Sequence, residues 1–240
     1  MLQKLRRHKR SISSALAALL AVWQVGQPLQ AADNTWTAGI DATWDNAGNW
    51  SLAATPLITD KAILPMGLLG GGTITLGGTS TAGTVRFEDN YLLSGGTLTL
   101  GAGGLSSSVG SRGRIDSLIA GTDGLFMTGG GAVILGNNGN TYTGVTTISN
   151  GALIISDPGQ LGTDASAVNV LSGNGTPSNT ASIGFVGGSL VLDGTAGGFT
   201  FARDLNLEGR GRFGDRSGAV VSFGNTTLSG VVHTASSTPT

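Results

Sequence analysis

The sequence has no cysteine, and only 11% of its 240 residues are charged and 5% aromatic. Without cysteine there is no thiol nucleophile, and the two histidines provide no zinc-ligand spacing. Many exported bacterial proteins avoid cysteine, so its absence does not indicate a redox compartment. At 39% hydrophobic residues the chain is too apolar for a charged, disordered protein.

Glycine is abundant instead. The 42 glycines show no Gly-X-Y period, which excludes collagen, and they alternate with threonines and short aliphatic runs. This composition predicts many short strands joined by tight turns. We therefore expect an all-β fold.

The N-terminus has the organisation of a secretory signal peptide. Residues 1–10 hold five basic side chains, an apolar run follows over 11–23, and Leu29-Gln30-Ala31-Ala32 is a small-residue cleavage boundary. We predict a signal peptide at 1–31; the run is too short for a confident membrane span, and no later segment is long enough. Its removal leaves eight basic and 14 acidic residues, a net charge of −6, which argues against nucleic acid as a partner.

A short pattern of glycine, a small residue and alternating aliphatics recurs along the chain. The copies are GGTITL (71–76), GGTLTL (95–100), GGAVIL (130–135), GALII (151–155) and GGSLVL (187–192). Because side chains alternate along a strand, Ile74 and Leu76 share one face, and so do Leu190 and Leu192. Equivalent strands at about one-coil intervals predict a right-handed parallel β-helix over 66–240. An antiparallel β-sandwich is the alternative.

Residues 32–65 differ from the rest, because Trp36, Trp44 and Trp50 lie within fifteen residues. A solenoid needs an atypical terminal unit over the open end of its core. We predict an aromatic N-terminal cap; the alternative is a platform on which sugar rings stack. The nearby carboxylates have no calcium-loop spacing; they are Asp41, Asp45 and Asp60.

One segment resembles a known family. Residues 120–156 contain Gly124-Leu125, the turn Thr128-Gly129-Gly130-Gly131, the run Asn140-Thr141-Tyr142-Thr143-Gly144 and a closing Gly151-Ala152-Leu153. At this spacing the segment is similar to the autotransporter-associated β-strand repeat, also called the passenger-associated transport repeat. It departs from the family at Met127, where Lys is usual, and at Val145, where Gly is common.

The resemblance implies an exported β-helical passenger whose repeat assists secretion and folding, and it implies no activity. Such proteins normally end in an outer-membrane barrel, whereas this sequence ends in GVVHTASSTPT. We therefore expect the chain to be truncated at its C-terminus, with a barrel or other outer-membrane export machinery outside this sequence. Within the repeat we expect the asparagines to serve the turn, the threonines to face outward, and Tyr142 to pack with its hydroxyl on a partner.

The sequence contains no convincing catalytic constellation. After signal removal the sole histidine is His233, interpreted as an exposed coil residue. Four acidic residues, scattered among arginines, could form an acid–base pair on a β-helix, but a solvated charged face is the simpler interpretation. They are Asp193, Asp204, Glu208 and Asp215, interleaved with Arg203, Arg210, Arg212 and Arg216. We assign no catalytic, cofactor-binding or metal-binding residue.

These observations predict a non-enzymatic β-helix exported to the cell surface or outer membrane of a Gram-negative-type bacterium. It would act as a passenger-like stalk or adhesin module, with surface glycans or other cells as partners. The alternative is a carbohydrate-binding or polysaccharide-degrading protein, motivated by the tryptophans and the acidic tract. An ice-ordering threonine array is a third hypothesis, although Ala132, Ile134, Ser189 and Val191 interrupt the threonines.

Overall fold

The computed structural model describes residues 31–39, 42–67, 71–171, 187–208 and 219–234. The chain divides into two units, Met1–Ala31 and Ala32–Thr240. The predicted signal peptide lies outside the described residues except for Ala31. Within the described part, no helix has the length and apolar character needed to cross a membrane.

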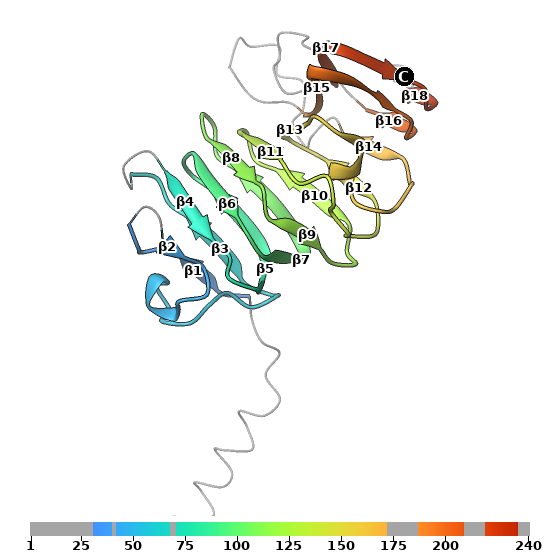
Figure 1. Ribbon diagram of the computed structural model, residues 1–240. Helices are drawn as coiled ribbons and strands as arrows, with labels where there is room; N and C mark the ends of the chain where they lie inside the picture. Colours follow the sequence, from blue (N-terminus) through green and yellow to red (C-terminus); the bar gives the residue numbers. More distant parts are fainter. Residues whose placement is uncertain (1–30, 40–41, 68–70, 172–186, 209–218, 235–240) are drawn as a thin grey trace, which may run out of the picture. The chain divides into compact units, whose positions relative to one another are not determined.

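The second unit consists of two parallel sheets whose strands alternate along the chain (Figure 1). One sheet contains β1 (Asp33–Thr35), β3 (Lys61–Leu64), β5 (Thr79–Phe87), β7 (Thr97–Ser107), β10 (Leu125–Thr128), β12 (Thr146–Ile148), β14 (Val168–Val170), β16 (Leu205–Leu207) and β18 (Val232–Thr234), in that order, with β9 (Leu118–Ala120) paired to β7. The other contains β2 (Ala42–Thr43), β4 (Gly72–Thr75), β6 (Tyr91–Ser94), β8 (Arg112–Ile115), β11 (Ala132–Leu135), β13 (Gly151–Ile155), β15 (Gly188–Phe201) and β17 (Val220–Leu228). Two 3-10 helices, η1 (Ala47–Asn49) and η2 (Pro158–Leu161), lie in the connections.

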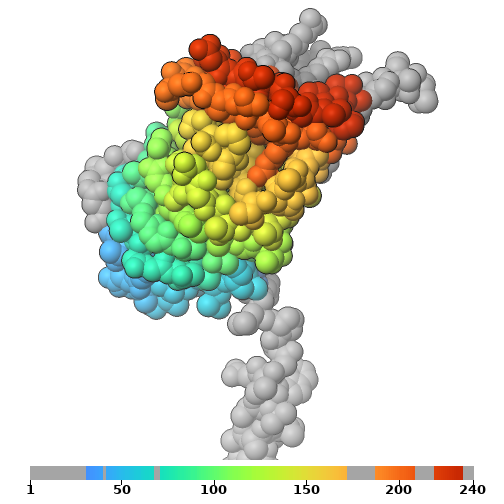
Figure 2. Space-filling model, turned by 45° about the vertical axis from the view of Figure 1, so that its right-hand side comes forward, coloured from blue at the N-terminus to red at the C-terminus, as the bar shows by residue number. Residues whose placement is uncertain are grey.

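Each circuit of the chain adds a strand to both sheets, so the unit is a parallel β-solenoid. Successive circuits form layers that follow the colour order of the sequence in Figure 2. All the strand ladders are parallel, and the one antiparallel pair in the described residues is the isolated bridge between Trp36 and Trp50. The parallel β-helix is therefore confirmed and the antiparallel sandwich is wrong. The right-handed sense of the coil stays a prediction.

The sequence analysis treated all five repeat copies as equivalent strands, but one of them lies in a different sheet from the others. Gly72 pairs with Tyr91 in the second sheet, whereas Thr97 of GGTLTL pairs with Thr79 in the first. Both sheets need the same inward alternation, so the local pattern cannot distinguish them. The later copies are correctly aligned, because Ala132 pairs with Ala152, and Gly151 with Gly188.

The core is built of side-chain columns that run along the stack. One column is formed by aliphatic residues from six consecutive strands of the second sheet, each at most 1% exposed: Ile74, Leu93, Ile115, Leu135, Ile155 and Leu192. Burying each contributes about 1.5–3 kcal/mol, against about 1–2 kcal/mol for ordering each residue's backbone. A coil with so few inward residues therefore depends on its neighbours.

The three N-terminal tryptophans are buried, with 0–2% of their surface exposed. The Trp50 ring meets Trp36 and Trp44 edge-on at centroid distances of 5.1 and 4.7 Å. Its Nε1 donates to the Trp44 carbonyl at 2.8 Å. No ring face is available to a sugar, so the stacking-platform alternative is wrong. The boundaries of a cap domain at 32–65 stay a prediction.

Residues 49–51 cover the free edge of the first coil. Ser51 N donates to the Thr35 carbonyl and Thr37 N to the Asn49 carbonyl, both at 2.8 Å. The Asn49 side chain donates to the Thr43 carbonyl at 2.7 Å. Strands β1 and β2 therefore both have hydrogen-bond partners beyond the stack.

Replacing Trp44→Ala should lower the free energy of unfolding by about 3–5 kcal/mol, because it opens a cavity beside the buried Trp50 indole. Urea denaturation followed by circular dichroism measures this. Leu52→Ala is the matched control, because Leu52 lies in the same segment and is 52% exposed; its effect should stay within about 0.5 kcal/mol. Equal effects of the two variants would contradict a structural role for the cluster.

Candidate functional site

The polar segment from Asn137 to Val145 connects β11 to β12. Its backbone stacks on the preceding coil, with Thr141 N donating to the Ile119 carbonyl at 2.9 Å and Thr143 N to the Gly121 carbonyl at 3.0 Å. At the entrance, the Asn137 carboxamide oxygen accepts from Gly139 N at 2.9 Å, which closes a local turn.

Asn140 is buried and bonds to the coils on both sides. Its carboxamide oxygen accepts from Ile119 N and its Nδ2 donates to the Gln160 carbonyl, each at 2.8 Å. The partners lie 21 and 20 residues away, about one coil in each direction. Without this side chain, the Ile119 amide and the Gln160 carbonyl would be buried without hydrogen-bond partners. Asn140 therefore joins three coils and is not free to contact a ligand.

Tyr142 is 1% exposed, and its hydroxyl lies 2.9 Å from Thr146 Oγ1. Burial raises the pKa of this phenol well above its usual range. The expected packing of Tyr142, with a partner for its hydroxyl, is confirmed. The expectation that the threonines face outward is wrong for Thr146, which is 2% exposed. Thr146 pairs with Leu125 on the inward side of the sheet, and its hydroxyl forms a hydrogen bond with the Tyr142 hydroxyl.

Gly162 in the next coil accommodates this tyrosine. Its φ is +72°, and a Cβ atom there would lie 2.4 Å from the Tyr142 carbonyl oxygen. Only glycine fits this approach. The NTYTG segment is therefore a structural element of the stack.

The outward face of the first sheet carries a row of polar side chains near its C-terminal end. Asn169, Asn206 and His233 are in register on β14, β16 and β18, and Asn206 Nδ2 donates to Asn169 Oδ1 at 2.8 Å. The row borders a hollow of about 350 Å³ lined by Asn169, Leu171, Asn206, Leu207, Glu208, His233 and Thr234. His233 is exposed as expected, but it belongs to a strand.

The sequence analysis missed the two asparagines of this row. Their signal was the shared pattern of Val168-Asn169-Val170 and Leu205-Asn206-Leu207, in which one polar residue separates two aliphatics. These tripeptides are 37 residues apart, the same step as Gly151 to Gly188 in the other sheet.

The described members of the acidic tract have separate structural partners. Asp193 accepts from the hydroxyl and amide of Thr195, and these hydrogen bonds lower the pKa of its carboxyl. Asp204 accepts from Val231 N at 2.7 Å, and Glu208 follows β16 beside the hollow. The structure records no carboxylate pair among these three. Asp215 and three of the arginines lie outside the described residues, namely Arg210, Arg212 and Arg216.

Arg203 does not belong to a solvated face. Its guanidinium donates to the carbonyls of Gly162, at 2.7 Å, and of Asp164, and so ties two coils together. The pKa of the Asp164 carboxyl is lowered, chiefly by the hydrogen bonds from Ser166. Arg203, which the sequence analysis interpreted as part of a solvated charged face, thus binds backbone carbonyls.

Two of the N-terminal carboxylates also serve the backbone. Asp45 accepts from Gly77 N at 2.6 Å and from the Ser80 hydroxyl at 2.7 Å. Asp60 accepts from Ala32 N and Leu57 N. Asp41 lies outside the described residues. In the part of the chain that the structure describes, no three His, Cys, Asp or Glu side chains gather in a group that could hold a metal.

The fold defines a parallel β-solenoid with polar outer rows and a closed N-terminal edge. The amino-acid sequence of this chain is 31% identical, over 147 residues or 58% of its length, to "Adhesin BmaC autotransporter" of Brucella suis biovar 1 (strain 1330). The chain spans about 4% of that protein's length. No family model matches, so the repeat family stays a prediction. No solved structure matches either.

Replacing Asn140→Ala should leave the Ile119 amide and the Gln160 carbonyl buried without partners. We expect a loss of about 2–6 kcal/mol in the free energy of unfolding, at about 1–3 kcal/mol for each of the two groups. Chemical denaturation measures it. Asn138→Ala, at an exposed position of the same loop, should change little. A near-neutral Asn140→Ala would show that the side chain does not hold the coils together.

Proposed function

We propose that the chain is a non-enzymatic β-solenoid exported to the cell surface, where it acts as a passenger-like stalk or adhesin module. The observation that carries this is the similarity to an autotransporter adhesin, which extends over more than half of the chain. A solenoid suits display, because each added coil extends the structure and presents another rung of outward side chains. The outer-membrane export machinery would be encoded outside these residues.

The repeat segment would assist secretion through the way coils build on one another. Asn140 and the backbone of 141–143 bond directly to the preceding coil. A coil that emerges after its neighbour has folded finds a strand edge and an inward apolar face already in place. Stepwise folding of this kind is typical of repeat proteins, in which each unit contacts only its neighbours.

Surface display is tested on intact cells that carry the natural gene. An antibody to residues 79–128 should label the cells, and added protease should remove the signal while a periplasmic marker stays intact. Deleting residues 2–23 should retain the protein in the cytoplasm, which provides the control for export. Cytoplasmic fractionation of the natural protein would refute the proposal.

Carbohydrate binding is the second candidate, favoured by the hollow beside Asn169, Asn206 and His233. Carboxamide and imidazole groups can donate to and accept from sugar hydroxyls. The strands that carry them are about 4.8 Å apart, so they present polar groups at regular intervals along the stack. Glu208 adds an acceptor on the rim.

A glycan array with the purified chain tests this second candidate. The double variant Asn206→Ala/His233→Ala should weaken any binding by about tenfold or more, the equivalent of losing about one hydrogen bond. Ser106→Ala, on β7 of the same sheet, should not weaken it. The absence of binding to any glycan, or equal binding by all variants, would remove carbohydrate binding at this hollow.

A further inference from the structure

Asp60 is a nearly buried carboxylate that has no cationic side chain as a partner among the described residues. It is only 6% exposed. Its sequence neighbour Lys61 pairs with Asp33 instead, at 2.8 Å, and the other ion pairs of the described residues do not include Asp60. Buried charges in proteins are normally paired, so this carboxylate lacks a positive charge that such a site usually contains.

Backbone amides hold the Asp60 carboxylate in place. Its Oδ2 accepts from Leu57 N at 2.9 Å, and its Oδ1 accepts from Ala32 N at 3.1 Å. The Asp60 carbonyl accepts from Gly83 N and Thr84 N of the neighbouring coil, at 2.8 and 3.1 Å. One carboxylate oxygen is therefore fixed beside the backbone nitrogen of Ala32.

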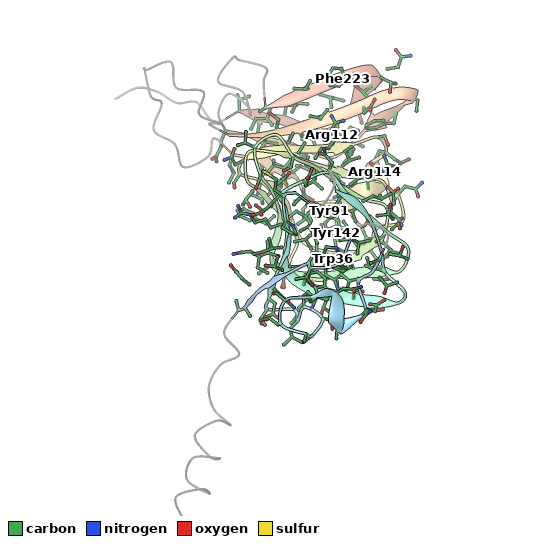
Figure 3. All side chains as sticks on the ribbon, turned by 90° about the vertical axis from the view of Figure 1, so that its left-hand side faces the viewer. Trp36, Tyr91, Arg112, Arg114, Tyr142 and Phe223 are labelled. Carbon is green, nitrogen blue, oxygen red and sulfur yellow. The ribbon has the colours of Figure 1, made fainter. Side chains whose placement is uncertain are left out.

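Ala32 is the first residue of the compact unit Ala32–Thr240, and it follows the exposed Ala31, at which the predicted signal peptide ends. The Ala32 carbonyl accepts from Lys61 N at 2.8 Å. The next residue begins β1, which leads to the buried Trp36 labelled in Figure 3. A cut after Ala32 would remove both of its hydrogen bonds, whereas a cut before it keeps them.

We propose that the exported chain is cleaved between Ala31 and Ala32, and that the new α-ammonium group of Ala32 forms an ion pair with Asp60. This site rests on the proposed export of the chain, because a leader peptidase of the exporting cell makes the cut. Water adds across the peptide bond, so that Ala31 gains a carboxylate and Ala32 an amine. The amine takes up a proton at neutral pH.

The new charge strengthens a contact that exists before cleavage. In the uncleaved chain Ala32 N is a neutral amide donor, whereas in the cleaved chain it is an ammonium beside the same oxygen. Charge-assisted hydrogen bonds are about twice as strong as neutral ones. A chain terminus frays unless it is tied down, and this pair holds the start of β1 on β3. Removal of the leader therefore stabilises the first coil.

The cleavage site is tested by expressing the chain with its own leader in a Gram-negative host and purifying the exported protein. N-terminal sequencing should read Ala-Asp-Asn-Thr, the sequence that begins at Ala32, and the intact mass should agree. An exported chain with a different first residue would overturn the site. Retention in the cytoplasm with the leader intact would instead refute the proposed function.

Acetylation of the exported chain tests the ion pair, because it removes the terminal charge and leaves an N–H. Lys61 is the one lysine after residue 31, so the Lys61→Arg variant has the α-amine as its only amine. Acetylation in denaturant, followed by refolding, should lower the folding equilibrium constant of this variant about five- to tenfold. Urea denaturation followed by circular dichroism measures the change.

Two further variants of the Lys61→Arg chain locate the effect. Asp60→Asn should reduce the effect of acetylation to about twofold or less, since no carboxylate then lies beside the amine. Asp33→Asn is the matched control, because it removes an exposed carboxylate of the next residue; the effect should persist. An equal effect in Asp60→Asn would overturn the pairing. A Lys61→Arg chain that is indifferent to acetylation would overturn it even if Asp60→Asn failed to fold.

Discussion

The structure depends on the contact of each coil with the next. Inward aliphatic columns and parallel ladders supply this contact, and neither exists within a single coil. Residues such as Ile115 and Leu135 are buried because the strands above and below cover them. The interior is mainly apolar, and some of the polar side chains that enter it have hydrogen-bond partners, either on neighbouring coils, as Asn140 has, or within the same coil, as Thr146 has.

The two ends of the described stack differ in how far their inward apolar side chains are covered. At the N-terminal end, Trp36, Trp44 and Trp50 supply a large apolar area and a returning segment bonds to the strand edges. At the other end, inward positions such as Leu228 remain partly exposed.

Strand type and inward face could be predicted because they follow from alternation, as Leu190 and Leu192 illustrate with their full burial. Membership of a sheet could not, since GGTLTL and GGTITL have the same local pattern and lie in different sheets. The roles of Asn140, Arg203 and Asp45 also escaped prediction. Their partners lie 20 to 41 residues away, and only the stacking of coils determines which carbonyl or amide comes within reach.

The steps between paired residues have a consequence for how such a chain can change. Ala132 and Ala152 are 20 residues apart and Gly151 and Gly188 are 37 apart, yet each pair spans one rung. The rise along the axis is therefore independent of the amount of sequence between rungs. Doubling a loop costs only about 0.6 kcal/mol of closure entropy. Insertions in the loops between rungs therefore change the stability of the solenoid very little. New surface segments can be gained or lost while the rungs before and after them keep their register.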